Sequence, residues 1–177
     1  MKTTTKFLAI ALALSTLSLS AVNAQSVEPL KEGKGVRVGI GASGGITSES
    51  SPFDYGLGAD LRLQWDLSNY VSVLGTGGYT RLFGKENNAD YDFIPAKGGV
   101  KVFPIGNMYA LGEIGAAFAI KEGSKTALIW SGGVGYEFKN GLDLGFRYES
   151  YQQDSASSTY VPQTGQYALR IAYGFKL

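Results

Sequence analysis

The sequence predicts an all-β protein that folds as a closed, eight-stranded, antiparallel, up-and-down transmembrane β-barrel. Three observations support this prediction: a leader of the secretory type, eight segments in which apolar and polar residues alternate, and connections that differ regularly in length. Alternation with a period of two gives a strand two unlike faces. A tilted strand that crosses a membrane needs about 9–11 residues, and most of these segments reach that length.

Residues 1–24 have the pattern of a signal peptide. Lys2 and Lys6 supply the positive start, residues 7–19 are mostly apolar, and Val22-Asn23-Ala24 is a cleavage site of the small-x-small kind. An uncleaved membrane helix is the weaker interpretation, because the apolar run is short and contains serine and threonine.

We therefore expect a mature chain that begins at Gln25. Residues 25–34 form a short periplasmic segment, and residues 35–177 form the outer-membrane barrel domain. No stretch of this mature chain approaches the roughly 20 apolar residues of a spanning helix, so any membrane crossing has to be made by strands.

The clearest alternation runs from Leu57 to Leu67, where leucine, alanine and tryptophan occupy one face and Asp60, Arg62 and Gln64 the other. The segment from Tyr167 to Leu177 repeats it. Six further segments alternate less regularly, at residues 36–42, 70–83, 93–103, 108–121, 125–138 and 142–151. Three apolar residues disturb the pattern by sharing the polar phase, namely Tyr109, Leu111 and Ile129.

The connections between these segments alternate in length. Long polar stretches are expected at residues 43–55, 84–92 and 151–166, with an intermediate one at 121–125. Short turns are expected at 67–70, 104–107 and at Asn140-Gly141, a pair typical of two-residue hairpins. Outer-membrane barrels have tight periplasmic turns and long outer loops, and an even number of strands leaves both chain termini in the periplasm.

The apolar face is expected to contact lipid. A lipid-facing band is bordered by aromatic girdles, and the candidates for such a girdle are Trp65, Tyr70, Phe103, Trp130 and Phe138. The opposite face is charged or small, and eight strands enclose a space that side chains can fill. Its basic and acidic groups are nearly equal in number and can therefore pair.

Residues 35–177 resemble the small outer-membrane barrels of the OmpA and OmpX type and the outer membrane protein beta-barrel domain proteins of Gram-negative bacteria. Proteins of this type commonly end in a strand that closes with an aromatic residue. The last five residues, Tyr173 to Leu177, depart from that pattern because they end in leucine and place Phe175 third from the end. The resemblance implies a cell outer membrane location, contact with lipid, lipopolysaccharide and the assembly machinery, and a lumenal charge network. The residues that match this network by position and phase are Arg62, Lys97, Glu113, Arg147 and Arg170.

Composition narrows the possible functions. The chain contains no cysteine or histidine, and we expect no catalytic, cofactor or metal site and no enzyme activity. A net charge of +1 gives no reason to expect nucleic-acid binding. We expect a monomer with a structural, surface-interaction or adhesion-type role through its extracellular loops. Two alternatives remain open: a narrow porin-like channel for ions or very small solutes, and a soluble periplasmic ligand-binding β-barrel.

Overall fold

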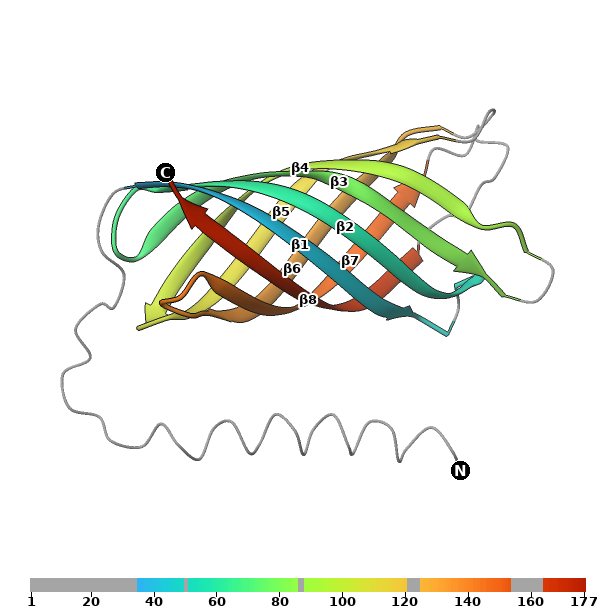
Figure 1. Ribbon diagram of the computed structural model, residues 1–177. Helices are drawn as coiled ribbons and strands as arrows, with labels where there is room; N and C mark the ends of the chain where they lie inside the picture. The colour runs from blue at the N-terminus through green and yellow to red at the C-terminus, as the bar shows by residue number, and fades with distance from the viewer. Residues whose placement is uncertain (1–34, 50, 86–87, 121–124, 154–163) are drawn as a thin grey trace, which may run out of the picture.

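A computed structural model of the protein describes residues 35–49, 51–85, 88–120, 125–153 and 164–177, which form eight antiparallel strands closed into one barrel (Figure 1). The strands are β1 (Gly35–Thr47), β2 (Phe53–Asp66), β3 (Val71–Gly84), β4 (Tyr91–Ile105), β5 (Met108–Ala119), β6 (Ala127–Glu137), β7 (Leu142–Gln153) and β8 (Thr164–Lys176). The predicted fold class is confirmed. The predicted signal peptide and the segment 25–34 lie outside the described residues.

The barrel is closed by the pairing of its first and last strands. β1 pairs with β2, from Gly35 opposite Asp66 to Ile46 opposite Tyr55. It also pairs with β8, from Arg37 opposite Lys176 to Thr47 opposite Gln166. Each of the eight described strands therefore has a neighbour on both sides. Closure of this kind removes the unpaired strand edges through which open sheets aggregate.

The two ends of the barrel differ in their connections. At one end, which we call the turn end, residues 67–70, 106–107 and 138–141 join the strands tightly. The start of β1 and the C-terminus lie at this end too (Figure 1). At the other end, the loop end, β1, β3, β5 and β7 finish and β2, β4, β6 and β8 begin.

The strands extend further into the loop end than the sequence predicted. β1 continues to Thr47 and β2 begins at Phe53, so that the first predicted loop, 43–55, shrinks to residues 48–52. Ser43 and Gly45 share the inward phase of β1 with Arg37. Small and polar residues are suited to a narrow lumen, which is why this stretch could be mistaken for a loop. β4 and β8 likewise begin inside the loops predicted at 84–92 and 151–166.

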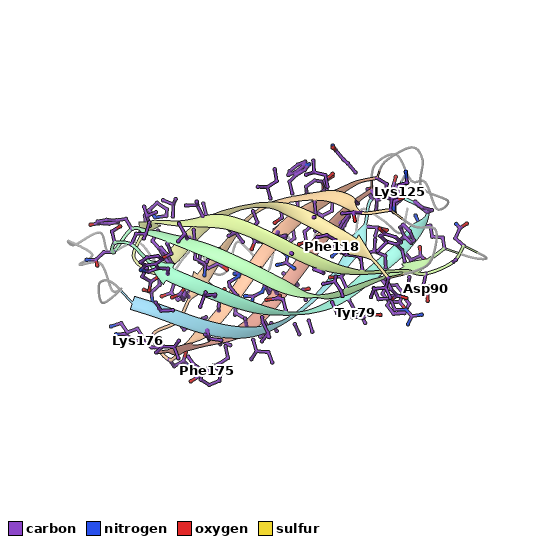
Figure 2. The ribbon with its side chains drawn as sticks, turned by 90° about the horizontal axis from the view of Figure 1, so that it is seen from above. Tyr79, Asp90, Phe118, Lys125, Phe175 and Lys176 are labelled. Carbon is purple, nitrogen blue, oxygen red and sulfur yellow. The ribbon has the colours of Figure 1, made fainter. Side chains whose placement is uncertain are left out.

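The outer face of the barrel is apolar and carries two belts of aromatic residues. Figure 2 labels Tyr79 of one belt and Phe175 of the other, which lie toward opposite ends of the barrel. The loop-end belt consists of Tyr55, Tyr79, Phe83, Phe118, Trp130, Tyr148 and Tyr167, and the turn-end belt of Trp65, Tyr70, Tyr136, Phe138, Tyr173 and Phe175. Aliphatic side chains such as Leu61, Ile114 and Leu169, each more than half exposed, lie between them. About ten residues separate Tyr55 from Trp65, which at ~3.3 Å per residue and a ~40° tilt corresponds to about 25 Å.

The prediction of the aromatic girdle is wrong for one residue, Phe103. Phe103 is only 2% exposed and lies inside the barrel, where its ring packs with Tyr109, Leu74 and Leu111. It has the inward phase of Lys101, two residues earlier in β4. Its position beside a tight turn suggested the lipid interface, but the phase of the strand decides which way a side chain points. The structure places Trp65, Tyr70, Trp130 and Phe138 on the outer face, each between 38% and 58% exposed.

None of the described residues forms a helix with the length and apolar character needed to cross a bilayer.

Candidate functional site

The candidate site is the interior of the barrel, where twelve charged side chains meet. Its cationic groups are Arg37, Arg62, Lys97, Lys101, Arg147 and Arg170, and its acidic groups are Asp60, Asp66, Glu113, Glu137, Asp143 and Glu149. Eleven of the twelve are buried, and the Arg37 side chain is 20% exposed. Equal numbers of opposite charges let a polar interior form without a net charge in a confined space.

Seven of these residues form a continuous series that we call the turn-side chain. In order of contact it consists of Asp66, Arg37, Glu137, Lys101, Asp143, Arg170 and Asp60. Arg170 binds Asp60 through two nitrogens, with Nε 2.9 Å from Oδ2 and Nη2 2.5 Å from Oδ1. A two-point contact of this kind fixes the guanidinium plane as well as its position.

Lys101 is the centre of the turn-side chain. Its side chain is fully buried, and Nζ lies 2.9 Å from Glu137 Oε2 and 2.7 Å from Asp143 Oδ2. Nζ also lies 4.0 Å from the centre of the Tyr109 ring, while the Tyr109 hydroxyl donates to Asp143 Oδ1 at 2.6 Å. Two carboxylates and an aromatic face thus replace the water that an ammonium group would otherwise bind.

The other five residues form the loop-side chain, which runs Arg62, Glu113, Lys97, Glu149 and Arg147. Lys97 is at its centre, 3.3 Å from Glu113 Oε2 and 2.6 Å from Glu149 Oε1. Hydroxyl groups complete the coordination of Glu113, because Thr76 donates to Oε1 at 2.9 Å and Ser131 donates to Oε2 at 3.1 Å.

All five residues predicted for the lumenal network lie inside the barrel, but in two separate chains. Arg62, Lys97, Glu113 and Arg147 belong to the loop-side chain, and Arg170 belongs to the turn-side chain. The site prediction left out the remaining members, Lys101 and Asp143 among them. Strand phase does place both on the charged face of the predicted strands, because Lys101 shares the phase of Lys97 on β4 and Asp143 shares the phase of Arg147 on β7.

A glycine on β1 makes room for part of this network. Gly41 faces the lumen, and a Cβ atom at this position would lie 2.6 Å from Nη2 of Arg170. Any larger residue would push that guanidinium away from Asp60. Gly41 therefore leaves the space into which the Arg170 side chain extends.

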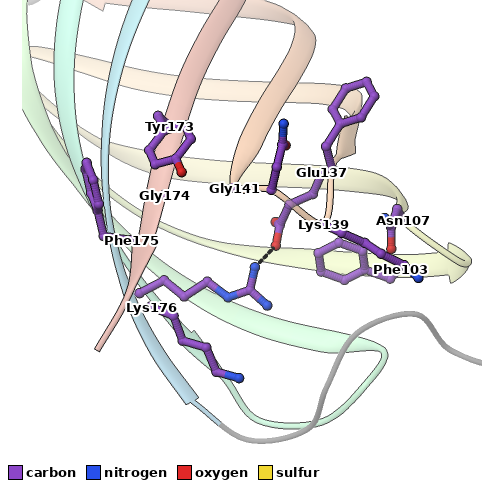
Figure 3. Close-up of a pocket in the computed structure, with 12 residues that line it drawn as sticks. Phe103, Asn107, Glu137, Lys139, Gly141, Tyr173, Gly174, Phe175 and Lys176 are labelled. Carbon is purple, nitrogen blue, oxygen red and sulfur yellow. Dashed lines mark hydrogen bonds and ion pairs between the residues drawn. The ribbon is translucent and has the colours of Figure 1, made fainter.

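The two ends of the lumen differ. At the loop end, apolar and aromatic side chains fill the interior: Phe53, Leu82, Tyr91, Phe93, Ala117, Ala127, Ile129 and Tyr151. At the turn end a vestibule of about 500 Å³ opens, with Arg37, Glu137, Lys139 and Lys176 among its lining residues (Figure 3). The dashed line in Figure 3 is the ion pair between Arg37 and Glu137. The interior is thus closed toward the loops and open toward the turns.

The acidic residues near the β3–β4 loop are engaged with the protein itself. Asp90 accepts hydrogen bonds from the Arg81 guanidinium and from the Gly84 amide, and Asp92 accepts one from the Tyr79 hydroxyl. Within the part of the chain that the structure describes, no group of three or more acidic side chains is arranged to hold a metal ion.

No protein-family model matches the sequence, and no curated protein matches it. Solved structures do. The attachment invasion locus protein Ail of Yersinia pestis has a TM-score of 0.56 at 18% identity, over 82% of this chain and all of Ail. Neisserial surface protein A has a TM-score of 0.53 at 16% identity, over 82% of this chain and 100% of its own. The outer membrane enzyme PagL has a TM-score of 0.51 at 19% identity, over 76% of this chain and 98% of its own. The chain therefore has the fold of the small eight-stranded transmembrane β-barrels.

Proposed function

We propose that the protein is an integral outer-membrane barrel with a closed lumen, whose loops carry a structural, surface-interaction or adhesion-type role. The observation that carries the proposal is the inversion of polarity across the wall. Leucine, isoleucine and aromatic side chains cover the outside, while the charged side chains are buried and paired inside. A soluble barrel needs the opposite arrangement, because a continuous apolar surface of this extent is not stable in water.

The two aromatic belts support the same conclusion. Tyrosine and tryptophan concentrate at the depth of lipid headgroups, and the apolar band of an outer-membrane barrel is about 25 Å tall. The spacing of the belts in β2 agrees with that height. The aromatic belts and the apolar band between them therefore argue against a soluble ligand-binding barrel.

The proposed orientation places the turn end and both chain termini in the periplasm and the loop end outside the cell. The short turns and the longer loops support it, as does the even number of strands. Lipid and lipopolysaccharide would contact the outer face, and the assembly machinery would deliver the chain. A monomer is favoured because every described strand already has two neighbours.

Orientation can be measured with single cysteines, because the chain contains none. Lys125 is exposed at the loop end, and Lys139 is exposed in a turn at the opposite end. In intact Gram-negative cells, a membrane-impermeant maleimide should label K125C, whereas K139C should react only after the outer membrane is permeabilised. Labelling of K139C alone in intact cells would contradict the proposed orientation.

The channel alternative depends on an open lumen. Two ion-pair chains and the apolar cluster at the loop end fill the interior, which supports a barrel that does not conduct. We expect single-channel currents near zero when the detergent-folded protein is inserted into a planar bilayer. Heat-modifiable migration on a denaturing gel serves as the control for folding. Large, steady and voltage-independent conductance from the folded protein would overturn the closed lumen in favour of a channel.

We also propose a binding or structural role rather than an enzymatic one. The chain has no histidine or cysteine to act as a base or nucleophile. Every acidic lumenal side chain is engaged by at least one cationic partner. Function then depends on the loops, which in a rigid scaffold are the segments free to vary.

A further inference from the structure

The Arg62 guanidinium is buried but only partly hydrogen-bonded. The residue is 4% exposed, its Nε donates to Thr76 Oγ1 at 3.2 Å, and its Nη2 donates to Glu113 Oε1 at 3.2 Å. Nη1 has no hydrogen-bond partner among the described residues. Buried N–H groups are almost always satisfied, because leaving one without a partner forfeits its hydration. Nη1 therefore marks a position where a partner from outside the chain is expected.

Arg62 is one of the residues that line a small cavity. Its volume is about 30 Å³, and its wall includes Arg62, Arg37, Arg170, Glu137 and Asp143. That volume is enough for one particle about the size of a water molecule or a halide ion. The wall on the β1 and β8 side is formed by Gly39, Ala172 and Gly174, which have little or no side chain and leave the space unfilled.

The distribution of charge favours an anion in this cavity. The loop-side chain has three cationic members and two acidic ones, and Arg62 is the member that lines the cavity. The two carboxylates on the wall, Glu137 and Asp143, both bind Lys101. Asp60 and Asp66 of the turn-side chain do not line the cavity, so its wall carries three arginines and only two carboxylates. A single negative charge beside Arg62 would therefore satisfy Nη1 and offset the cationic excess on the cavity wall.

Arg147 provides an internal comparison. Its Nη1 also lacks a hydrogen-bond partner among the described residues. The cavity next to it measures only about 10 Å³, and its wall includes the carboxylates of Asp60 and Glu149. The smaller volume disfavours an anion there, and so does the charge on the wall, where the two cations Lys97 and Arg147 only match the two carboxylates. The two arginines thus differ in the cavity beside them, because the one at Arg62 is larger and has more cations than carboxylates on its wall.

The cavity is reached from the turn end. Arg37 and Glu137 line both the cavity and the vestibule, and Lys139 and Lys176 stand at the vestibule wall (Figure 3). Lysine side chains there raise the local concentration of anions at the entrance. The apolar cluster closes the lumen at the loop end. Because Arg37 and Glu137 form an ion pair and line both spaces, an anion that enters the cavity would pass this pair.

We propose that this cavity is a binding site for one small monovalent anion of the halide class, held by Nη1 of Arg62 and loaded from the turn end. The site is separate from any function of the loops. It would act as a thirteenth charge in the lumen and would couple the stability of the barrel to the anion on the turn side of the membrane.

Bromide makes the proposal directly testable. Crystals of the full chain refolded in detergent and grown in sodium bromide should show an anomalous peak within hydrogen-bond distance of Nη1 of Arg62. Iodide is the larger probe and should give a weaker peak or none in so small a cavity. An ordered water without anomalous signal at that position, or bromide found only on the outer surface, would overturn the proposal.

A solution experiment uses the same protein with matched variants. Unfolding temperature is compared in sodium bromide and in sodium gluconate at equal ionic strength, because gluconate is too large for the cavity. We expect bromide to raise the unfolding temperature of the wild type and of R81Q, which removes a partly exposed cation outside the lumen. R62Q should lose the difference between the two salts. Equal bromide stabilisation in R62Q would refute the assignment, and the crystallographic test covers the case in which R62Q does not fold.

Discussion

The substitution Leu61→Arg is expected to destabilise the membrane-inserted barrel by roughly 2–4 kcal/mol and to lower the yield of insertion into lipid vesicles. Leu61 is 61% exposed on the outer face of β2 and lies between Tyr55 of one aromatic belt and Trp65 of the other. An arginine on the lipid face costs roughly 2–4 kcal/mol at mid-bilayer. That cost is a large fraction of the total stability of a domain, which is about 5–15 kcal/mol. The folded fraction after dilution from urea into vesicles, scored by heat-modifiable migration, is the measurement.

Asp54→Arg is the matched control for this prediction. Asp54 is exposed on the same strand but beyond Tyr55, at the loop end. The cost of arginine falls to about 0–1 kcal/mol near the membrane interface, so this variant should fold nearly as well as the wild type. If both variants fold equally well, Leu61 does not face hydrocarbon, and the membrane-spanning assignment of the outer face is wrong.

The substitution Lys101→Met is expected to lower the free energy of unfolding by about 3–5 kcal/mol. Lys101 is fully buried, and its removal leaves Asp143 and one oxygen of Glu137 without their ammonium partner. Breaking a buried ion pair from one side is costly because the remaining charge stays in a site of low polarity. Equilibrium unfolding in guanidinium chloride, with the protein in vesicles, gives the difference from the wild type.

The double variant K101M/D143N separates lost charge from lost packing. The amide that Asp143→Asn introduces carries no charge, and its oxygen could still accept a hydrogen bond from the Tyr109 hydroxyl, which in the wild type lies 2.6 Å from Asp143 Oδ1. We expect the double variant to regain most of the stability that K101M loses, since replacing both partners of a buried pair is often nearly neutral. A double variant as unstable as K101M would show that the charge left on Asp143 is not what destabilises K101M.

The sequence predicted the strands well and their loop ends poorly. Alternation in β2 and β8 is regular because each residue faces either lipid or a crowded lumen, and the two demand different side chains. At the loop end of β1 the alternation fades into glycine, serine and threonine, which also form loops. The three long loops were therefore predicted too long, at 43–55, 84–92 and 151–166.

The inward-facing aromatic residues were the harder part. Phe103 and Phe93 are large and apolar, yet they are 2% and 0% exposed and lie inside. Tyr109 and Ile129, which disturbed the alternation in the sequence, also point inward, at 4% and 1% exposed. A lumen of eight strands has apolar layers above and below its charged layer, and nothing local in the sequence separates such a layer from a lipid-facing one. Strand phase is the more reliable guide.

The pairing of lumenal charges could not be predicted from one sequence. Arg170 and Asp60 lie on β8 and β2, and Lys101 contacts residues of β6 and β7. Phase indicates which side chains point inward, but their partners depend on how far the strands are staggered and how long each side chain is. These are properties of the closed barrel, and they exist only once all the strands are in place.

The closing ladder between β1 and β8 also governs how the protein can assemble. Seven of the eight ladders join strands that follow one another in sequence and can form as hairpins, whereas the eighth brings Arg37 beside Lys176. Pairings so distant in sequence form slowly, because the entropy of a long loop is lost before the contact is gained. Until β8 docks, the free edge of β1 can hydrogen-bond to a strand of another molecule. Refolding yield should therefore fall steeply as protein concentration rises. Pairing of β1 with β8 of the same chain completes the barrel, whereas pairing of β1 with another molecule leads to aggregation.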